Sequence, residues 1–258
     1  MSTLSRTAAL VSLALLCAFA APAFAMSRGH EAPLPPPGVQ VAGVEVLTRG
    51  PIHEAFAEPV IFDPAAGLIV PVAPPAPINE SAPEMGPATP GMSWIPGYWA
   101  WDQDRNGYIW ISGAWRLAPP NCAWVPGYWT PVSNGYQWVA GFWLPGNAQE
   151  VTYLPDPPPS QDIGPIGLAP SPDTVWIPGV QVWQGRGYAW RPGYWAAAQA
   201  NWLWNPAHYA WTPRGYIFID GYWDYPLSHR GVLFAPAAIE ASVTPSAAGR
   251  PSILPVPV

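Results

Sequence analysis

The chain repeats a six-residue motif, W-x-x-G-x-W, in two blocks of four copies. The copies begin at residues 94, 110, 124 and 138 in the first block and at 176, 190, 204 and 218 in the second. All but one of the steps within a block are 14 residues long. The copies are rich in Trp, Tyr, Val and Ile and contain Pro and Gly, which favours strands and disfavours helices. The repeat therefore predicts an all-β, antiparallel fold.

The Trp and Gly positions of the copies are interpreted as structural repeat positions, and most of their rings as packing groups. In the first block they are Trp94, Gly97, Trp99, Trp110, Gly113, Trp115, Trp124, Gly127, Trp129, Trp138, Gly141 and Trp143. In the second block they are Trp176, Gly179, Trp190, Gly193, Trp195, Trp204, Phe218, Gly221 and Trp223. Side chains alternate between the faces of a strand, so both faces would carry an indole. We expect the second Trp of one strand to lie over the Gly of its neighbour.

The connections between successive copies alternate in type. Gly-containing turn signals follow every odd copy, at 104–107, 133–135, 184–187 and 212–215. The connections at 117–123 and 196–201 lack that signature. Each pair of copies is therefore predicted to form a β-hairpin. Two hairpins would make a four-stranded meander in each block, over residues 93–145 and 175–226.

The segments outside the blocks are rich in Pro. An N-terminal segment, 26–92, is expected to be extended, with one strand within 39–50 and a helical turn at 53–56. The linking segment 146–174 contains VTYL at 151–154 and is interpreted as an ordered strap. The tail, 227–258, holds one apolar run and is otherwise expected to be disordered.

The first 25 residues have the layout of a secretory signal peptide. A basic residue, Arg6, precedes an uncharged apolar stretch, and the small-residue pattern Ala23-Phe24-Ala25 ends it. We expect cleavage after Ala25 and an extracytoplasmic location, in the periplasm, on the cell surface or secreted, with no membrane span left. The alternatives are an uncleaved anchor, which Pro22 would interrupt, and lipidation of Cys17, which lacks the usual small residue before it.

Charge and cysteine content exclude several classes of function. The formal net charge is −6, and loss of Arg6 makes the mature chain one unit more negative. Such a chain has no electrostatic footprint for nucleic acid or anionic lipid. Cys122 is the sole cysteine of the mature chain, so it forms no internal disulfide and is expected to be a buried or idle thiol.

The sequence contains no recognisable catalytic constellation. The four histidines are widely spread, and His208 stands where other copies have Tyr, so it is interpreted as a ring substitute rather than a metal ligand. Two acid pairs could in principle perform glycosidase chemistry. They are Asp102 with Asp104 and Asp220 with Asp224, and the simpler interpretation is that they stabilise a turn and a strand end. We expect no catalytic residues, no metal site and no cofactor.

The copies WIPGYW, WVPGYW and WRPGYW resemble the YXWGXW repeat family of bacterial exported proteins, over about residues 94–143 and 176–223. The resemblance implies an extracytoplasmic or cell-surface protein and brings no catalytic residues. The leading hypothesis is a non-catalytic structural or interaction protein of the cell envelope or surface, with a protein or glycan of the envelope as its partner. Exposed sheet edges would also permit self-association.

The alternative is a carbohydrate-binding module, because dense aromatic rings can form a binding platform. Its candidate residues are Trp101, Trp202 and Trp211, which lie outside the motif positions. An enzyme of an unknown class ranks third.

Overall fold

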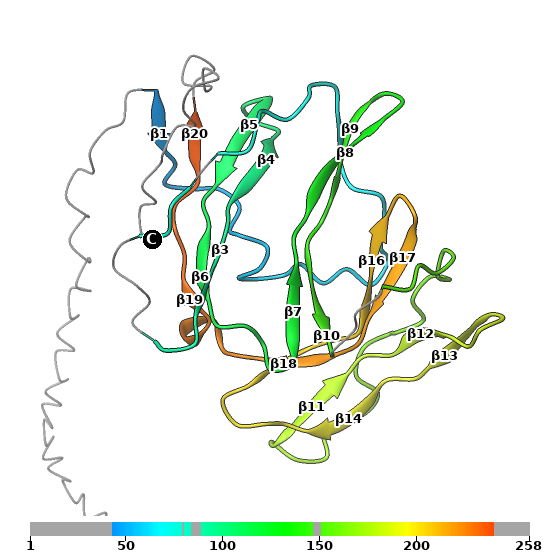
Figure 1. The fold of residues 1–258 in the computed structure, drawn as a ribbon. Helices are drawn as coiled ribbons and strands as arrows, with labels where there is room; N and C mark the ends of the chain where they lie inside the picture. The colour runs from blue at the N-terminus through cyan, green and yellow to red at the C-terminus, as the bar shows by residue number, and fades with distance from the viewer. Residues whose placement is uncertain (1–42, 79, 84–88, 147–150, 240–258) are drawn as a thin grey trace, which may run out of the picture. The chain divides into compact units, whose positions relative to one another are not determined.

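The computed structural model describes residues 43–78, 80–83, 89–146 and 151–239 (Figure 1). The predicted signal peptide and the end of the tail lie outside these residues. The described chain is all-β, as predicted, and contains one short 3-10 turn, Leu227–His229. No helix in this part of the chain is long and apolar enough to cross a membrane.

Each pair of motif copies forms one long β-hairpin, as predicted, and each strand of a hairpin breaks in two at the motif glycine or the residue that replaces it. The first hairpin contains β3 (Ser93–Ile95), β4 (Tyr98–Asp102), β5 (Gly107–Ile111) and β6 (Ala114–Arg116). The second contains β7 (Cys122–Val125), β8 (Tyr128–Val132), β9 (Gly135–Val139) and β10 (Phe142–Pro145). The third contains β11 (Thr174–Ile177), β12 (Val180–Trp183), β13 (Tyr188–Arg191) and β14 (Tyr194–Ala197). The fourth contains β15 (Leu203–Asn205), β16 (His208–Thr212), β17 (Gly215–Ile219) and β18 (Tyr222–Asp224).

Within a hairpin, the inner strands pair beside the turn and the outer strands pair at the open end. In the first hairpin, β4 pairs with β5 and β3 with β6, and the other three hairpins follow the same plan. The turns fall where Gly-containing signals were found, and each of the four contains a residue with a positive φ, at Asn106 (47°), Gly135 (146°), Gly185 (81°) and Gly215 (127°).

The predicted four-stranded meanders are wrong. Among the described residues no ladder joins β6 to β7 or β14 to β15. The connection between the first two hairpins contains Pro119 and Pro120, which have no N–H to give to a ladder, and then turns at Asn121 with φ 58°. The corresponding connection in the second block turns in the same way at Asn201, with φ 64°. Each hairpin is thereby directed away from the next one instead of being paired with it.

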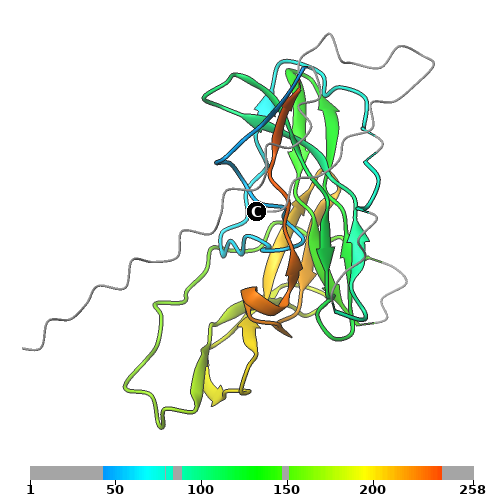
Figure 2. The same ribbon diagram turned by 90° about the vertical axis from the view of Figure 1, so that its left-hand side faces the viewer.

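Segments from outside the repeats pair with the hairpin edges instead. The strand expected within 39–50 includes β1 (Val44–Val46), which pairs with β20 (Ala237–Ile239), and β20 pairs with β5 (Figures 1 and 2). Strand β19 (Gly231–Val232) pairs with β6, and β2 (Ile69–Val70) pairs with β9. In the linking segment, Leu154 forms an isolated bridge with Tyr216 of the fourth hairpin. The N-terminal segment and the apolar run of the tail therefore contribute strands to the sheets, and the strap contacts the fourth hairpin through a single bridge.

The largest apolar cluster joins the two blocks. Phe142 and Trp143 of the second hairpin pack with Ile217, Ile219 and Tyr222 of the fourth, and all five side chains are buried. Ala55 from the N-terminal segment completes this cluster with Ile95 of the first hairpin. The core is thus shared by three hairpins and by the segment that precedes them.

Candidate functional site

In the first two hairpins the indole rings form cross-strand pairs on either side of the motif glycine pair, and in the third and fourth hairpins one such pair forms, at the open end. In the first hairpin Trp94 lies opposite Trp115, and Trp99 opposite Trp110, with ring centroids 5.5 and 5.3 Å apart. Aromatic pairs of this geometry contribute about 0.5–1.5 kcal/mol beyond the area they bury. The equivalent pairs in the other hairpins are Trp124 with Trp143, Trp129 with Trp138, Trp176 with Trp195, and Trp204 with Trp223.

At every motif glycine except Gly97, the ring that covers the glycine is the first Trp of the facing copy, so the expectation that the second Trp would do so is wrong. A Cβ on Gly141 would lie 2.5 Å from Cζ2 of Trp124, and one on Gly127 would lie 2.5 Å from Cζ2 of Trp138. The register explains this arrangement, because Trp124 stands opposite Trp143 and its ring leans diagonally onto the residue two positions earlier. The motif requires Gly here because a Cβ has no room beneath the indole.

The motif glycines also donate their N–H groups to carboxylates from outside the repeats. Gly141 N–H donates to Glu54 Oε2 at 2.9 Å, and Trp138 Nε1 of the same copy donates to Glu54 Oε1 at 2.9 Å. Gly113 N–H donates to Glu80 Oε2 at 2.6 Å in the first hairpin. We call a motif glycine whose N–H donates to such a carboxylate a carboxylate notch. In the second hairpin the indole N–H of Trp138 adds a second donor.

The third hairpin has the same contact from the linking segment. Gly179 N–H donates to Asp162 Oδ2 at 3.0 Å. The three acids share one local sequence feature, because each lies between two prolines six to eight residues apart. The flanking prolines are Pro51 and Pro59, Pro77 and Pro83, and Pro159 and Pro165. Each of these three hairpins therefore holds a proline-flanked segment by its acid.

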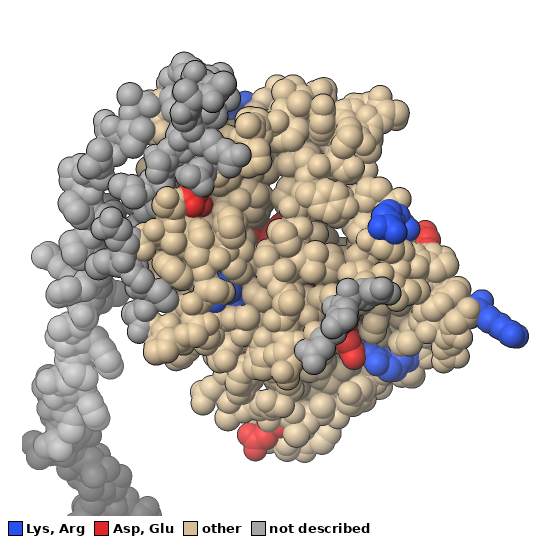
Figure 3. Space-filling view, viewed as in Figure 1, with Lys and Arg blue, Asp and Glu red and all other residues tan. Residues whose placement is uncertain are grey.

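Burial and hydrogen bonding act in opposite directions on these carboxylates. Desolvation by burial raises the pKa of Glu54 and of Glu80, while the glycine N–H groups favour the charged form and lower it. The donors are neutral dipoles rather than cations, as in other backbone anion sites. Charged side chains form small separate patches on the surface seen in Figure 3.

The fourth hairpin departs from this pattern. Its altered copies place Ala207 and Phe218 where the second hairpin has Gly127 and Trp138. Phe218 packs against the apolar cluster that contains Ala207, and we infer that its smaller ring leaves space for the Ala207 methyl group. The sequence shows both changes, but it does not show that the two residues are partners.

The remaining donors of the fourth hairpin lie beside an open groove. Gly221 N–H donates to Oδ1 of the preceding residue, Asp220, at 2.9 Å. Trp204 Nε1 is buried and has no hydrogen-bond partner in the described part of the chain, as is also true of four other indole nitrogens. Trp204 and Gly221 line a groove of about 310 Å³ together with Trp202 and Trp223.

A second set of polar groups converges between the second and fourth hairpins. Glu58 Oε1 lies 2.9 Å from His208 Nε2, and Glu58 Oε2 accepts hydrogen bonds from Trp143 N–H and the Tyr222 hydroxyl, at 3.1 and 2.7 Å. The other ring nitrogen of His208 faces the carbonyl of Pro206 at 2.9 Å. The Glu58 and His208 side chains are 3% and 4% exposed, so neither group faces solvent.

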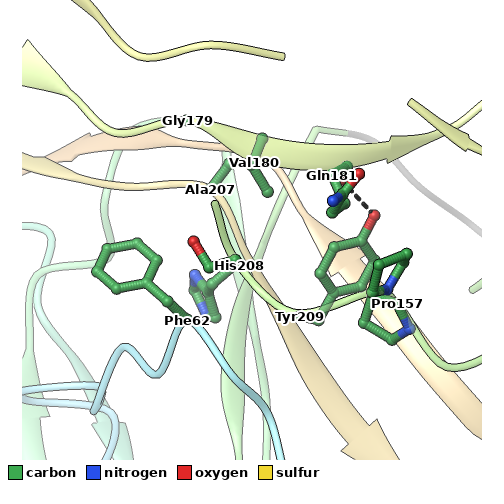
Figure 4. A pocket seen from close by; sticks show the side chains of 10 residues that line it. Phe62, Pro157, Gly179, Val180, Gln181, Ala207, His208 and Tyr209 are labelled. Atoms are coloured by element: carbon green, nitrogen blue, oxygen red, sulfur yellow. Dashed lines mark hydrogen bonds between the residues drawn. The ribbon is translucent and has the colours of Figure 1, made fainter. Parts of the chain in front are cut away.

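The cavity beside His208 is too small for a substrate. Phe62, His208, Tyr209 and Gln181 line it between the third and fourth hairpins (Figure 4), and its volume is about 10 Å³. A space of that size holds about one water molecule. The Tyr209 hydroxyl donates to the carbonyl of Gln181 across it, at 2.7 Å.

The structure does not bring the three candidate binding rings together. Trp101 packs edge-on against Tyr108 on the facing strand, and Trp202 lies against Tyr225 with ring centroids 4.6 Å apart. Trp211 lines a different groove, of about 230 Å³, beside Trp138. Among the described residues, the most exposed rings are instead two motif tyrosines, Tyr128 and Tyr194, at 48% and 54%, followed by Phe62 and Tyr153.

Cys122 is half-buried, and burial raises the pKa of its thiol to about 11. The thiol is therefore protonated at neutral pH and a poor nucleophile. In the part of the chain that the structure describes, no three His, Cys, Asp or Glu side chains are placed to hold a metal ion together.

Comparison with known proteins identifies the repeat unit. A family model described as WXXGXW repeat (2 copies) matches residues 90–116, 123–143, 175–197 and 200–224. Each of the four matches coincides with one hairpin, so two motif copies make one structural unit. No curated protein and no solved structure matches the chain.

Proposed function

Since the chain belongs to the WXXGXW repeat family, we propose that it is an exported, non-catalytic interaction protein of the cell envelope or surface. Its aromatic hairpins would act as surfaces that bind extended polypeptide. The observation that carries the proposal is the recurrence of the carboxylate notch, in which Glu80, Glu54 and Asp162 attach outside segments to three hairpins.

The sequence offered two acid pairs as an alternative, catalytic set. The contacts of two of these acids support the non-catalytic proposal. Asp102 Oδ1 accepts hydrogen bonds from the N–H groups of Asp104 and Arg105, at 2.9 and 3.2 Å, which is the geometry of a turn. Asp224 is buried against Arg116, whereas Asp220 is exposed. Asp102 is therefore engaged in a turn, and Asp224 in a buried ion pair.

The test is photo-crosslinking of the exported chain in living cells. A photoreactive residue at Tyr128 or Tyr194 would lie on the exposed rings, and one at Arg186, in a hairpin turn, would be the matched control. We expect discrete crosslinked envelope proteins from the two tyrosine positions and not from the turn. A chain that remains in the cytoplasm would contradict the proposal, and so would a hydrolase activity that Asp220→Asn abolishes.

The groove beside Trp202 favours a second candidate function, glycan binding. Three Trp side chains line that groove, and sugars stack their apolar faces on such rings. Titration of tryptophan fluorescence with cell-wall polysaccharides tests this alternative. A saturable shift that Trp202→Ala removes would support it, and no shift with any polysaccharide would count against it.

A further inference from the structure

One strand edge of the third hairpin has no added strand, although the same edge is covered in the other three hairpins. Strand β20 pairs with β5, β2 pairs with β9, and Leu154 bridges Tyr216 of β17, always antiparallel. The equivalent strand of the third hairpin is β13, which among the described residues pairs with β12 alone (Figure 1). An unpaired edge offers N–H and carbonyl groups on which another chain can form a ladder.

We propose that β13 takes an added strand from a second copy of this chain, and that this strand is the segment 252–256 of the tail. The inference rests on the proposed function, because it names the extended polypeptide that one aromatic hairpin binds. Addition of a strand to an exposed sheet edge is a general way in which proteins bind extended peptides. The contact would join the third hairpin of one copy to the tail of another, so it can continue from copy to copy.

The second and fourth hairpins show which backbone groups receive an added strand. Tyr216 N–H donates to the Leu154 carbonyl at 2.9 Å, and Leu154 N–H donates to the Tyr216 carbonyl at 2.7 Å. In the second hairpin Val70 faces Tyr136, which holds the same position in its copy as Tyr216. In both hairpins the tyrosine that follows the turn glycine therefore presents its backbone to the added strand.

Tyr188 holds this position in β13. It faces Trp183 within its hairpin, as Tyr136 faces Pro131 in the second hairpin, so its N–H and carbonyl point away from β12. The Tyr188 hydroxyl donates to the Pro155 carbonyl at 2.5 Å, but no described residue of the strap forms a ladder with β13. The strap thus contacts the Tyr188 ring and leaves the strand edge unpaired.

The space beside the preceding glycine is also open in the third hairpin. A Cβ on Gly135 would collide with the Val70 carbonyl oxygen, and one on Gly215 would lie 2.7 Å from that of Leu154. A Cβ on Gly187, which precedes Tyr188, would meet nothing within 4 Å. The place that an added strand fills in two hairpins is therefore empty of described residues in the third.

The sequence of the added segments indicates the occupant. Val70 and Leu154 are aliphatic, and each is followed directly by Pro, which has no N–H and so ends the ladder. Residues 69–72 read Ile-Val-Pro-Val, and residues 253–256 read Ile-Leu-Pro-Val. These tail residues lie outside the described part of the chain. In the proposed contact Leu254 would face Tyr188 as Val70 faces Tyr136.

We assign the segment to a second copy rather than to the same chain. A tail that paired with its own third hairpin would close this edge to other molecules, whereas the proposed function needs it open. Residues 252–256 carry no charge, so the segment brings no like charge to a chain whose formal net charge is −6.

The first experiment measures binding of labelled peptides to the mature chain, residues 26–258, by fluorescence anisotropy. The peptide has the sequence of residues 249–258, GRPSILPVPV. One version is N-methylated at Leu254, whose N–H would donate to the Tyr188 carbonyl. The matched control is N-methylated at Ile253, whose N–H would point away from β13, because backbone groups alternate along a strand. We expect the control to bind at least about tenfold more tightly, which corresponds to about 1.4 kcal/mol.

The second experiment locates the edge by disulfide crosslinking between two differently tagged chains, both with Cys122→Ser. One chain carries Ile253→Cys and the other carries Ala189→Cys, which the proposed register places opposite each other. Such residues between two hydrogen-bonded pairs have Cα atoms about 4.5 Å apart, which is within the range of a disulfide. Tyr128→Cys, at an exposed position of the second hairpin, is the control for random collision. We expect a mixed dimer with Ala189→Cys and none with Tyr128→Cys.

Sedimentation velocity tests whether the copies associate. Wild type should associate as its concentration rises, and Leu254→Asp, which places a charge in the proposed strand, should remain monomeric. Near-ultraviolet circular dichroism checks that the variant keeps the fold of the hairpins.

Three outcomes would overturn the inference. Equal binding of the two N-methylated peptides would exclude strand addition, and equal crosslinking to Ala189→Cys and Tyr128→Cys would exclude β13 as the edge. A wild type that stays monomeric at every concentration would exclude a second copy. If these outcomes occur while the envelope crosslinks persist, this inference fails and the proposed function stands.

Discussion

Arg116 and Asp224 form a buried ion pair between the end of the first hairpin and the end of the fourth. Arg116 Nη2 donates to both carboxylate oxygens, at 2.8 and 2.7 Å, and the two side chains are 0% and 3% exposed. The guanidinium also lies over the Trp143 ring, with its central carbon 5.3 Å from the centroid. One contact between residues 108 positions apart thus ties the first repeat block to the second.

Breaking this pair should be strongly destabilising. Arg116→Met leaves the buried Asp224 carboxylate with Arg230, at 3.0 Å, as its remaining charged partner, and with the Tyr225 N–H, at 2.8 Å. We expect a loss of about 3–5 kcal/mol in the free energy of unfolding. Urea denaturation followed by tryptophan fluorescence measures it. Arg105→Gln, which breaks an exposed pair with Glu45, is the control and should leave the midpoint unchanged. Equal effects of the two substitutions would contradict the prediction that the buried Arg116–Asp224 pair stabilises the fold.

The carboxylate notch of the second hairpin predicts a specific dependence on Glu54. Glu54→Ala leaves Gly141 N–H and Trp138 Nε1 buried without acceptors, at an expected cost of about 2–4 kcal/mol. Glu54→Gln keeps an acceptor and should cost less. Thermal and urea unfolding of both variants, with Glu45→Ala as an exposed control, test the prediction. An alanine variant as stable as the glutamine variant would show that the acid does not hold the hairpin.

The space over a motif glycine can be tested directly. In Gly141→Ala the new methyl group would lie 2.5 Å from the Trp124 ring and 2.8 Å from Gly127 N, so the hairpin must open. Crowding of this kind costs about 1–3 kcal/mol or more. Gly187→Ala, in a turn where a Cβ meets nothing within 4 Å, is the matched control. A neutral Gly141→Ala would mean that the indole does not cover the glycine.

Ala207 and Phe218 of the fourth hairpin stand where the second hairpin has Gly127 and Trp138, and this predicts coupling between two substitutions. Phe218→Trp would bring an indole onto the Ala207 methyl group and should destabilise the chain by about 1–3 kcal/mol. Adding Ala207→Gly should restore most of that loss, because the pair then matches Trp138 with Gly127 of the second hairpin. A double-mutant cycle measures the interaction energy. Simple additivity of the two changes would contradict the proposed partnership.

His53 predicts a loss of stability in acid. Its Nε2 lies 3.0 Å from the carbonyl of Pro96, and Ala55 N–H donates to its Nδ1 at 3.1 Å, so the buried ring is neutral. Burial lowers the pKa of His53 from 6.5 to about 4. As the pH falls, His53 of the unfolded chain therefore takes up a proton before His53 of the folded chain does. The free energy of unfolding is highest above pH 6.5 and falls by about 3 kcal/mol toward pH 4.

The measurement is the free energy of unfolding of wild type and His53→Asn across that range. The pKa of Glu54 and of Glu80 is raised by burial, so these acids act in the opposite direction, but they do so equally in both proteins. The wild type should lose more stability than the variant on acidification. If the free energy of unfolding of wild type and His53→Asn falls equally on acidification, a buried, neutral His53 ring is ruled out.

Much of the fold could be predicted because its signals are local. The period of the copies and the turn signals at 104–107 and 212–215 are sufficient to predict the hairpins, since turn chemistry and strand propensity depend on neighbouring residues. The prediction of four-stranded meanders is wrong because of the connection through Pro119 and Pro120. The sequence of a six- or seven-residue connection does not reveal whether the next hairpin pairs with the preceding one or is directed away from it.

The candidate site could be predicted only in part. Trp202 was singled out and lies in the groove, but it shares no surface with Trp101 or Trp211. The acids of the notches were missed, although each stands between two prolines, because nothing local links Glu80 to Gly113. A contact between distant positions leaves no periodic signal in a single chain.

The sequence by itself determined the hairpin unit, its turns and the need for glycine beneath an indole, because sterics and strand pairing act over a few residues. Only the tertiary structure decided which acid holds which glycine, and that Arg116 meets Asp224. Those contacts depend on how separate segments are brought together, and burial then selects the few polar partners that can satisfy one another.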